Sequence, residues 1–279
     1  MSIVLEEKRG HLLKLISDYG SCAVAFSGGV DSSVVAKAAQ DTLGVSAVAV
    51  TAVSASLASA ELKSAREIAD QIGIRHVEIS TSELSNPAYT ANAPDRCYHC
   101  KTELYSVLLN RLSSLEVNVI VNGANADDLG DFRPGHRAAE EHGVVSPLAE
   151  CGISKTEVRQ LARDWKLPVA EKPAAPCLSS RIAYGQAVTA ERLRMIEAAE
   201  TILRGLGLEE VRVRYHADEL ARLEVPAAAI GRVAEPKIRS HLAQSFRELG
   251  FNYVTLDLEG FRSGSLNDLV PIESLSHFS

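Results

Sequence analysis

Apolar and polar positions along the first part of the chain predict strands and helices in alternation. Short apolar runs that indicate buried strands are followed by longer segments in which apolar residues recur at helical spacing. The predicted strands cover residues 22–26, 45–53, 75–79 and 117–121, and the predicted helices cover 6–18, 34–39, 58–72, 101–112 and 155–165. Strand–helix repeats of this kind are typical of a parallel, doubly wound sheet. We therefore expect an α/β fold for this part of the chain.

The pattern changes near residue 185. The predicted elements beyond it are a helix over 190–206, strands over 210–215 and 221–225, a long helix within 227–249 and a last strand over 252–258. The first two of these strands alternate apolar and polar positions, which is typical of a sheet with one solvated face. We therefore expect two domains, an α/β domain over 1–185 and a smaller α+β domain over 186–279 that binds substrate or mediates oligomerisation.

Composition and charge exclude several classes of protein. The 279 residues are 46% hydrophobic and 23% charged, which is the profile of an ordinary globular protein. No apolar stretch reaches the roughly 20 residues that a bilayer crossing needs, and the polar first residues do not resemble a signal peptide. The net charge of −7 argues against a large nucleic-acid-binding surface. Five cysteines, an odd number without an export signal, favour a reducing cytoplasm over a disulfide framework.

The strongest chemical signal is the turn Ser27-Gly28-Gly29-Val30-Asp31-Ser32-Ser33 between the first predicted strand and the next helix. Glycines at such a turn let the backbone approach a phosphate closely, and the first N–H groups of the helix point at it. The lysine of a Walker loop is absent. The turn therefore predicts a phosphate site with a task other than ordinary γ-phosphate hydrolysis, and a plain glycine-rich connection is the alternative.

This turn resembles the PP-loop of the ATP pyrophosphatases, which cleave ATP between the α- and β-phosphates and adenylate an oxygen of their substrate. The resemblance implies that pyrophosphate and its Mg²⁺ are held by Ser27, Gly28, Gly29, Asp31, Ser32 and Ser33. It also implies that Thr51, at the end of the next predicted strand, lines the adenine pocket. Simple core packing would explain Thr51 equally well.

Acidic residues follow the fourth predicted strand, at the edge of the sheet where doubly wound folds bind ligands. Asp127, Asp128 and Asp131 are candidates for binding Mg²⁺ or positioning substrate. A turn with helix-capping aspartates is the alternative. The polar stretch 129–143 is predicted to be a long active-site loop.

Three cysteines lie where a metal centre is a candidate. Cys97 and Cys100 form a CxxC at the start of a predicted helix, after a predicted loop over 85–95, and Cys177 lies in a segment broken by prolines. Incidental thiols, a zinc site and an iron–sulfur cluster with three thiolates and one open iron all stay open from the spacing. Cys22 is predicted to be a core residue, and Cys151 to lie in a turn without a chemical role.

Further segments resemble the LarE family of ATP-dependent sulfur transferases, in the same order and over nearly the whole chain. They are the residues around 94–100, 123–135, 176–181, 211–216 and 253–264. Relatives that sacrifice the sulfur of the cysteine matching Cys177 lack the CxxC. This chain has all three cysteines, so it resembles the branch in which a [4Fe-4S] cluster is held by Cys97, Cys100 and Cys177.

The resemblance implies roles for basic residues as well. Lys101 and Arg181 match family positions that contact phosphates, so they are predicted to be catalytic together with Cys177; solvated surface cations are the alternative. Arg212 and Arg214 alternate on a predicted strand and so face the same side. A nucleotide phosphate between them would offset their repulsion, whereas pairing with nearby glutamates such as Glu209 or Glu224 is the competing interpretation.

The resemblance implies a specific reaction. The enzyme would use ATP and Mg²⁺ to adenylate a carboxylate of pyridinium-3,5-biscarboxylic acid mononucleotide and convert it to a thiocarboxylate, for the nickel-pincer nucleotide cofactor of lactate racemase. The expected partners are this small-molecule nucleotide, further copies of the chain in a homo-oligomer and other proteins of the cofactor pathway, but neither nucleic acid nor membrane. Three alternatives stay open: sacrificial transfer from Cys177, another PP-loop ligase or tRNA thiolase, and a nucleotide-binding module without turnover.

Overall fold

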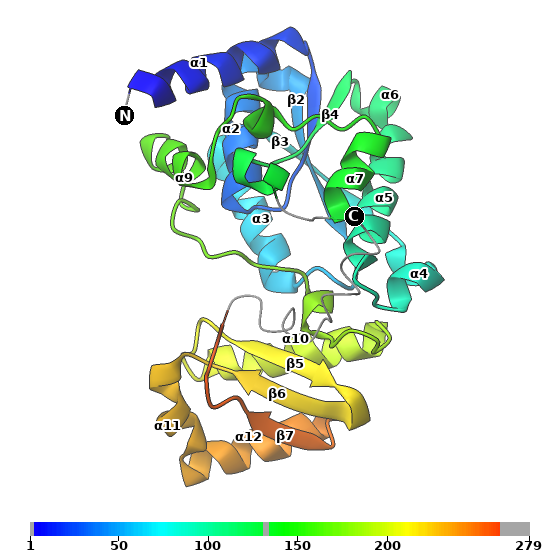
Figure 1. Ribbon diagram of the computed structural model, residues 1–279, viewed down its shortest axis with the longest axis vertical. Coiled ribbons are helices and arrows are strands. Elements are labelled where there is room, and N and C mark those ends of the chain that lie inside the picture. Colours follow the sequence, from blue (N-terminus) through cyan, green and yellow to red (C-terminus); the bar gives the residue numbers. More distant parts are fainter. Residues whose placement is uncertain (1–2, 131–133, 263–279) are drawn as a thin grey trace. The chain divides into compact units, whose positions relative to one another are not determined.

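A computed structural model describes residues 3–130 and 134–262 of the chain (Figure 1). Contacts divide the chain into two compact units. The first consists of Met1–Glu83 and Cys97–Ala175, and the second of Leu84–Arg96 and Pro176–Ser279. The segment 84–96 thus belongs to the second unit, although it lies between strands of the first in sequence. The predicted domain boundary near residue 185 stays a prediction.

The first unit contains a parallel sheet of four strands in the order β3-β2-β1-β4. Its strands are β1 (Cys22–Ala25), β2 (Ala47–Val53), β3 (Arg75–Ser80) and β4 (Val119–Val121). The sheet grows in one direction from β1 to β3 and in the other from β1 to β4. The predicted doubly wound α/β fold is confirmed, and its switch point, where such folds bind ligands, lies between β1 and β4.

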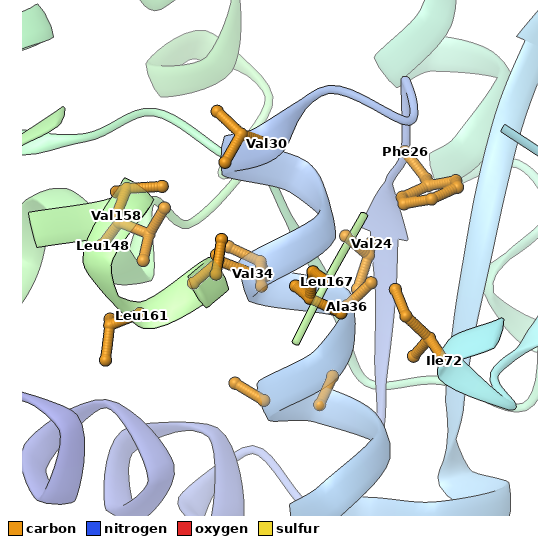
Figure 2. Close-up of a cluster of buried hydrophobic side chains, with 14 of the residues drawn as sticks. Val24, Phe26, Val30, Val34, Ala36, Ile72, Leu148, Val158, Leu161 and Leu167 are labelled. Atoms are coloured by element: carbon orange, nitrogen blue, oxygen red, sulfur yellow. The ribbon is translucent and has the colours of Figure 1, made fainter. Parts of the chain in front are cut away.

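Helices cover both faces of this sheet because its strands are apolar on both sides. One core joins Cys22 and Val24 of β1 to α1 (Ile3–Asp18), α2 (Val30–Leu43), α3 (Ser59–Ile72) and α9 (Lys155–Asp164). Figure 2 shows part of this core, including Val24, Val34 and Leu161. The other core joins Ala23 to α5 (Arg96–Leu109), α6 (Leu112–Leu115) and α7 (Pro134–Glu141).

Three predicted boundaries in the first part of the chain were wrong. The helix predicted from residue 101 begins at Arg96, so the CxxC lies within its first two turns. The predicted loop 129–143 contains α7, whose buried side is made only of Ala138 and Ala139 and therefore gives a weak apolar signal. The predicted loop 85–95 contains the short helix α4 (Pro87–Thr90), which Asn86 caps by accepting a hydrogen bond from the amide of Ala88.

The second unit contains a mixed sheet of three strands. In it β5 (Arg212–His216) pairs antiparallel with β6 (Leu220–Glu224), and β6 pairs parallel with β7 (Tyr253–Leu256). Its helices are α10 (Ala190–Gly205), α11 (Ile230–Ala234) and α12 (Pro236–Glu248). The helix predicted within 227–249 is divided because Glu235 takes an extended conformation before Pro236. The predicted α+β character is confirmed.

Shorter elements complete the described ranges. They are α8 (Pro147–Glu150) and the 3₁₀ helices η1 (Gly44–Ser46), η2 (Glu83–Ser85), η3 (Ala126–Gly130), η4 (Leu178–Arg181), η5 (Ala217–Glu219) and η6 (Ala227–Ala229). None of the helices in these ranges has the length and apolar character that a bilayer crossing requires.

Candidate functional site

The turn after β1 has the geometry of an anion site. Gly28 has a φ of +69°, and a Cβ there would lie 2.9 Å from the Cα of Ala65 in α3, so only glycine fits. Gly29 is the N-cap of α2 and provides no side-chain cap. The first amides of α2 therefore keep their partial positive charge for a ligand. Phe26 and Val30, on either side of the turn, are buried in the core and hold both ends of the turn in place.

Serine hydroxyls line the inside of this turn. The Ser32 hydroxyl donates to the carbonyl of Gly29 over 3.1 Å, and the amide of Gly29 donates to the Ser27 hydroxyl over 3.3 Å. Ser33 is fully buried, and its hydroxyl has no hydrogen-bond partner among the described residues. A buried hydroxyl without a partner is costly in a folded protein. The turn is therefore a preformed polar cradle with donors still to be satisfied.

The turn after β4 closes on this cradle, as its place in the sheet predicts. A Cβ on Gly123 would lie 2.7 Å from the amide nitrogen of Ser32, so the two turns are in direct backbone contact. The side-chain amide of Asn125 donates to Asp31 Oδ1 over 3.2 Å. Residues from two strand ends thus meet at the switch point of the sheet.

The candidate aspartates differ in what they contact. Asp31 has one carboxylate oxygen 2.5 Å from Lys155 Nζ. Asp127 accepts from the backbone amide of Lys155, and Asp128 accepts from the backbone amide of Asn125. Asp127 and Asp128 therefore have the capping and turn-forming contacts of the alternative interpretation. Asp131 lies outside the described residues.

Two lysines from distant segments reach the cradle, although it has no lysine of its own. Lys155, the first residue of α9, contacts Asp31. Lys172 lies 3.5 Å from the carbonyl of Gly28 and pairs with Glu61 over 2.8 Å. The sequence pattern missed both, because only the fold brings them to the loop. Hydroxyls and the Asp31 carboxylate are hard oxygen donors of the kind that Mg²⁺ prefers, so they fit this ion.

The carboxyl end of β2 is polar and buried. Thr51 is 2% exposed, and its hydroxyl donates to the carbonyl of Phe26 over 2.8 Å while it contacts His76 Nε2 over 2.8 Å. Because the Thr51 hydroxyl donates its one proton to Phe26, it accepts from His76 Nε2, and burial lowers the pKa of this ring. Beyond this strand, the buried Glu83 accepts hydrogen bonds from Ser54 and Ser56. The Thr51 hydroxyl therefore holds the strand before the cradle in place, and its role in adenine binding stays a prediction.

The five cysteines fall into two groups. Cys97 and Cys177 are exposed and Cys100 is partly exposed, whereas Cys22 and Cys151 are buried. Burial raises the pKa of Cys22 to about 12 and that of Cys151 to about 11, so these thiols are inert. Within residues 3–130 and 134–262, no group of three or more histidines, cysteines and carboxylates is arranged to hold a metal ion. The three-cysteine cluster stays a prediction.

Known proteins resemble this chain over its whole length. The family model for asparagine synthase matches residues 15–129. An uncharacterized protein of Synechocystis, slr1717, is 48% identical over 95% of this chain and 98% of its own. The pyridinium-3,5-bisthiocarboxylic acid mononucleotide synthase of Lactiplantibacillus plantarum is 37% identical over 99% of both chains. The chain belongs to the family of this synthase, the LarE family. The predicted family and the predicted enzyme class, an ATP-dependent sulfur transferase with a PP-loop domain, are confirmed.

A tRNA-modifying enzyme matches less of the chain. The tRNA-specific 2-thiouridylase MnmA of Azorhizobium caulinodans is 32% identical over 61% of this chain and 53% of its own length. The synthase therefore matches nearly the whole chain, whereas this thiouridylase matches about three fifths of it.

The basic residues predicted from the LarE resemblance have unequal surroundings. Lys101 is exposed on α5, with its Nζ 5.9 Å from the ring centre of Tyr105. Arg181 is 4% exposed and pairs with Glu200 over 2.9 Å. Arg181 is therefore no solvated surface cation, and its guanidinium is bound inside the second unit.

The two arginines of β5, Arg212 and Arg214, also have different surroundings. Arg214 is 6% exposed and pairs with Glu224 over 2.8 Å, as the competing interpretation had it. Arg212 is partly buried, and its guanidinium carbon lies 5.1 Å from the ring centre of Phe261. Burial and the neighbouring guanidinium of Arg181 lower the pKa of Arg212 to about 10. Arg212 is thus a partly buried cation with a second guanidinium group nearby, an arrangement that an anion between the two would stabilise.

Proposed function

We propose that the protein uses ATP to adenylate a carboxylate of pyridinium-3,5-biscarboxylic acid mononucleotide and then replaces its activated oxygen by sulfur. The observation that carries the proposal is the full-length similarity to a synthase named for the bisthiocarboxylic acid product. The geometry of the cradle supports it, because a phosphate site without a Walker lysine suits release of pyrophosphate rather than γ-phosphate hydrolysis.

The residues of the cradle account for the first half-reaction. A carboxylate is a poor electrophile because its oxygen leaves badly, and adenylation makes that oxygen part of the AMP leaving group. The amides of the first turn of α2 and the ammonium groups of Lys155 and Lys172 stabilise negative charge on the departing pyrophosphate. Mg²⁺, held at Asp31, would supply further charge neutralisation there. Thr51 and the carboxyl end of β2 lie on the side proposed for adenine.

The second half-reaction needs a sulfur source. We assign this task to a [4Fe-4S] cluster held by Cys97, Cys100 and Cys177, in which the iron without a protein ligand would carry an additional sulfide. The accessible thiols support the assignment, since these are the three cysteines of the chain that are not buried. Cys97 and Cys100 are three residues apart within the first two turns of α5 and so lie on one side of the helix.

Further parts of the proposal concern the substrate and the cell. We assign the phosphate of the substrate nucleotide to Arg212, a partly buried cation beside the guanidinium of Arg181. Lys101 is assigned to a phosphate as well. The protein is placed in the cytoplasm as a homo-oligomer that works with other proteins of the same cofactor pathway.

Anaerobic reconstitution with iron and sulfide tests the cluster. Wild-type protein should bind about four irons and absorb broadly in the visible region. Cys97→Ala and Cys177→Ala should lose this absorption, whereas Cys151→Ala serves as the matched control and should keep it. Protein that stays colourless after reconstitution would contradict the cluster. An intact mass lowered by the elements of H₂S after turnover would show that Cys177 itself gives up its sulfur.

A further inference from the structure

The residues around Cys177 are held by their backbone carbonyls. We call residues 176–183 the Cys177 segment. Arg181 donates from one guanidinium nitrogen to the carbonyls of Pro176 and, over 2.9 Å, Cys177. The following residues are bound in the same way by other side chains: Arg96 donates to the carbonyl of Ser179 over 2.8 Å, Arg214 donates to that of Ser180 over 2.9 Å, and Asn92 donates to those of Ile182 and Ala183 over 3.2 and 2.9 Å.

These side chains are buried, and each is itself anchored. Arg96, Arg181 and Arg214 are 6%, 4% and 6% exposed. Arg181 pairs with Glu200 and Arg214 with Glu224, while Arg96 donates to the side-chain carbonyl of Asn92. Buried ion pairs are weak contributors to stability because desolvation opposes their attraction, so their presence here calls for another explanation. A fixed guanidinium gives directional hydrogen bonds, which suits the placing of a loop.

The hydrogen bonds fix the backbone of Cys177 while its thiol stays exposed. The Cys177 carbonyl accepts from Arg181, from the Ser180 amide over 3.0 Å and from the Ser180 hydroxyl over 2.7 Å. Leu178 and Ser179, which follow it, are buried. The segment therefore presents one reactive side chain from a backbone that has little freedom. Group transfer depends on such placement of the reacting atom.

We infer that Arg96, Arg181 and Arg214 are positioning residues that hold the Cys177 segment. The inference rests on the proposed function, in which Cys177 takes part in sulfur transfer. It gives Arg181 and Arg214 a task other than phosphate binding, because their guanidinium groups are occupied by carbonyls and carboxylates. Arg96 also immediately precedes Cys97 in the chain, so the same device fixes the backbone beside a second proposed ligand.

The test compares Arg181→Met with Arg204→Met. Both arginines pair with Glu200, but Arg204 is partly exposed and its described contact is with Glu200 rather than with the segment. In metal-free protein, Arg181→Met should raise amide hydrogen exchange at Ser180 and Ile182 by at least about tenfold, and it should change the alkylation rate of Cys177 severalfold. The alkylation rate of Cys97 and all rates in Arg204→Met should stay at wild-type values.

A second variant guards against a folding failure. Arg181→Met combined with Glu200→Leu removes the pair without leaving a buried charge, so it should fold and still show the loosened segment. Wild-type exchange at Ser180 in this folded double variant would overturn the inference. So would a raised KM for the nucleotide substrate with unchanged Cys177 alkylation, which would indicate phosphate binding by Arg181. Both readouts on metal-free protein are independent of turnover, so absence of sulfur transfer by the wild type would contradict the proposed function alone.

Discussion

The cradle after β1 and the Cys177 segment hold their reactive groups in position by opposite kinds of hydrogen-bonding groups. The cradle is made of backbone amides, glycines and small hydroxyls, and its only buried orphan atom within the described residues is the Ser33 hydroxyl. In the Cys177 segment most backbone carbonyls accept hydrogen bonds from buried arginine or asparagine side chains. The cradle presents hydrogen-bond donors to an anion. In the Cys177 segment the backbone carbonyls accept hydrogen bonds from the protein itself, and the thiol of Cys177 stays exposed.

This difference shows that charged side chains have different tasks in the two regions. Fixed amides and the ammonium groups of Lys155 and Lys172 at the cradle can stabilise charge that develops on a leaving group. Arg181 and Arg214 in the second unit are already paired with Glu200 and Glu224, so they stabilise geometry rather than a developing charge. The two sites should therefore respond differently to substitution, and the largest effect is expected where a buried charge loses its partner.

The strongest way to break the second region is to remove one partner of a buried pair. Glu224→Leu would leave the Arg214 guanidinium buried without its carboxylate, and it should lower the free energy of unfolding by about 3–5 kcal/mol. Urea denaturation measures this change. The matched control is Asp18→Asn, which breaks the exposed pair with Lys14 and should change stability little. Equal effects of the two substitutions would contradict the buried arrangement.

The cradle should break through sterics rather than charge. Gly123→Ala would place a methyl group 2.7 Å from the amide nitrogen of Ser32, so the two turns must move apart. We expect substrate-dependent pyrophosphate release to fall by about 100-fold, comparable to loss of a fixed donor in an oxyanion site. Gly10→Ala, where nothing lies within 4 Å of the added atom, is the control and should have wild-type activity. Retained activity in Gly123→Ala would show that the turns are not in contact.

A smaller effect is expected in the reactivity of the cysteines, which differ in exposure between the two groups. At pH 8 and a thiol pKa of about 11 to 12, the thiolate fraction of Cys151 and Cys22 is on the order of 0.1% or less. Alkylation of native metal-free protein followed by peptide mass mapping should modify Cys97 and Cys177 and leave Cys22 and Cys151 unmodified. Unfolding in denaturant should expose all five. Rapid labelling of Cys22 in native protein is the result that would refute its burial.

The smallest expected effect is a pH dependence that both regions share. Burial lowers the pKa of His76 in the first unit and of His216 in the second. Below a pH of about 6.5 the unfolded chain binds protons that the native rings do not, so stability falls as the pH is lowered through this value. His76→Gln and His216→Gln should each make the decline between pH 7 and pH 5.5 shallower in thermal unfolding. A steeper decline would mean that these rings are charged in the native protein.

The sequence predicted the cradle well because its information is local. Gly28 and Asp31 lie in one short motif, and the helix predicted from residue 155 does begin at Lys155, where Ser154 and Glu157 form a capping box. Parallel strands also place the turn after β4 beside the cradle by topology alone. Helix α7 was missed because its buried side is made of two alanines, a pattern that resembles a polar loop.

The sequence could not predict the surroundings of the arginines. Arg181 and Glu200 are 19 residues apart, and Arg96 meets a carbonyl 83 residues away. The spacing of residues in the sequence does not distinguish an arginine that binds a phosphate from an arginine that is buried in an ion pair. The pairing of Arg214 with Glu224 was foreseeable as an alternative, because adjacent antiparallel strands place such residues together. Only the tertiary structure decides between the two.

The most direct test of sulfur transfer is a product analysis under anaerobic conditions. Reconstituted protein is incubated with ATP, Mg²⁺, sulfide and pyridinium-3,5-biscarboxylic acid mononucleotide, and the products are measured by mass spectrometry. We predict a product in which sulfur replaces a carboxylate oxygen, with AMP and pyrophosphate formed in equal amounts. AMP and pyrophosphate without any sulfur-containing product, or no pyrophosphate at all, would contradict the proposed function.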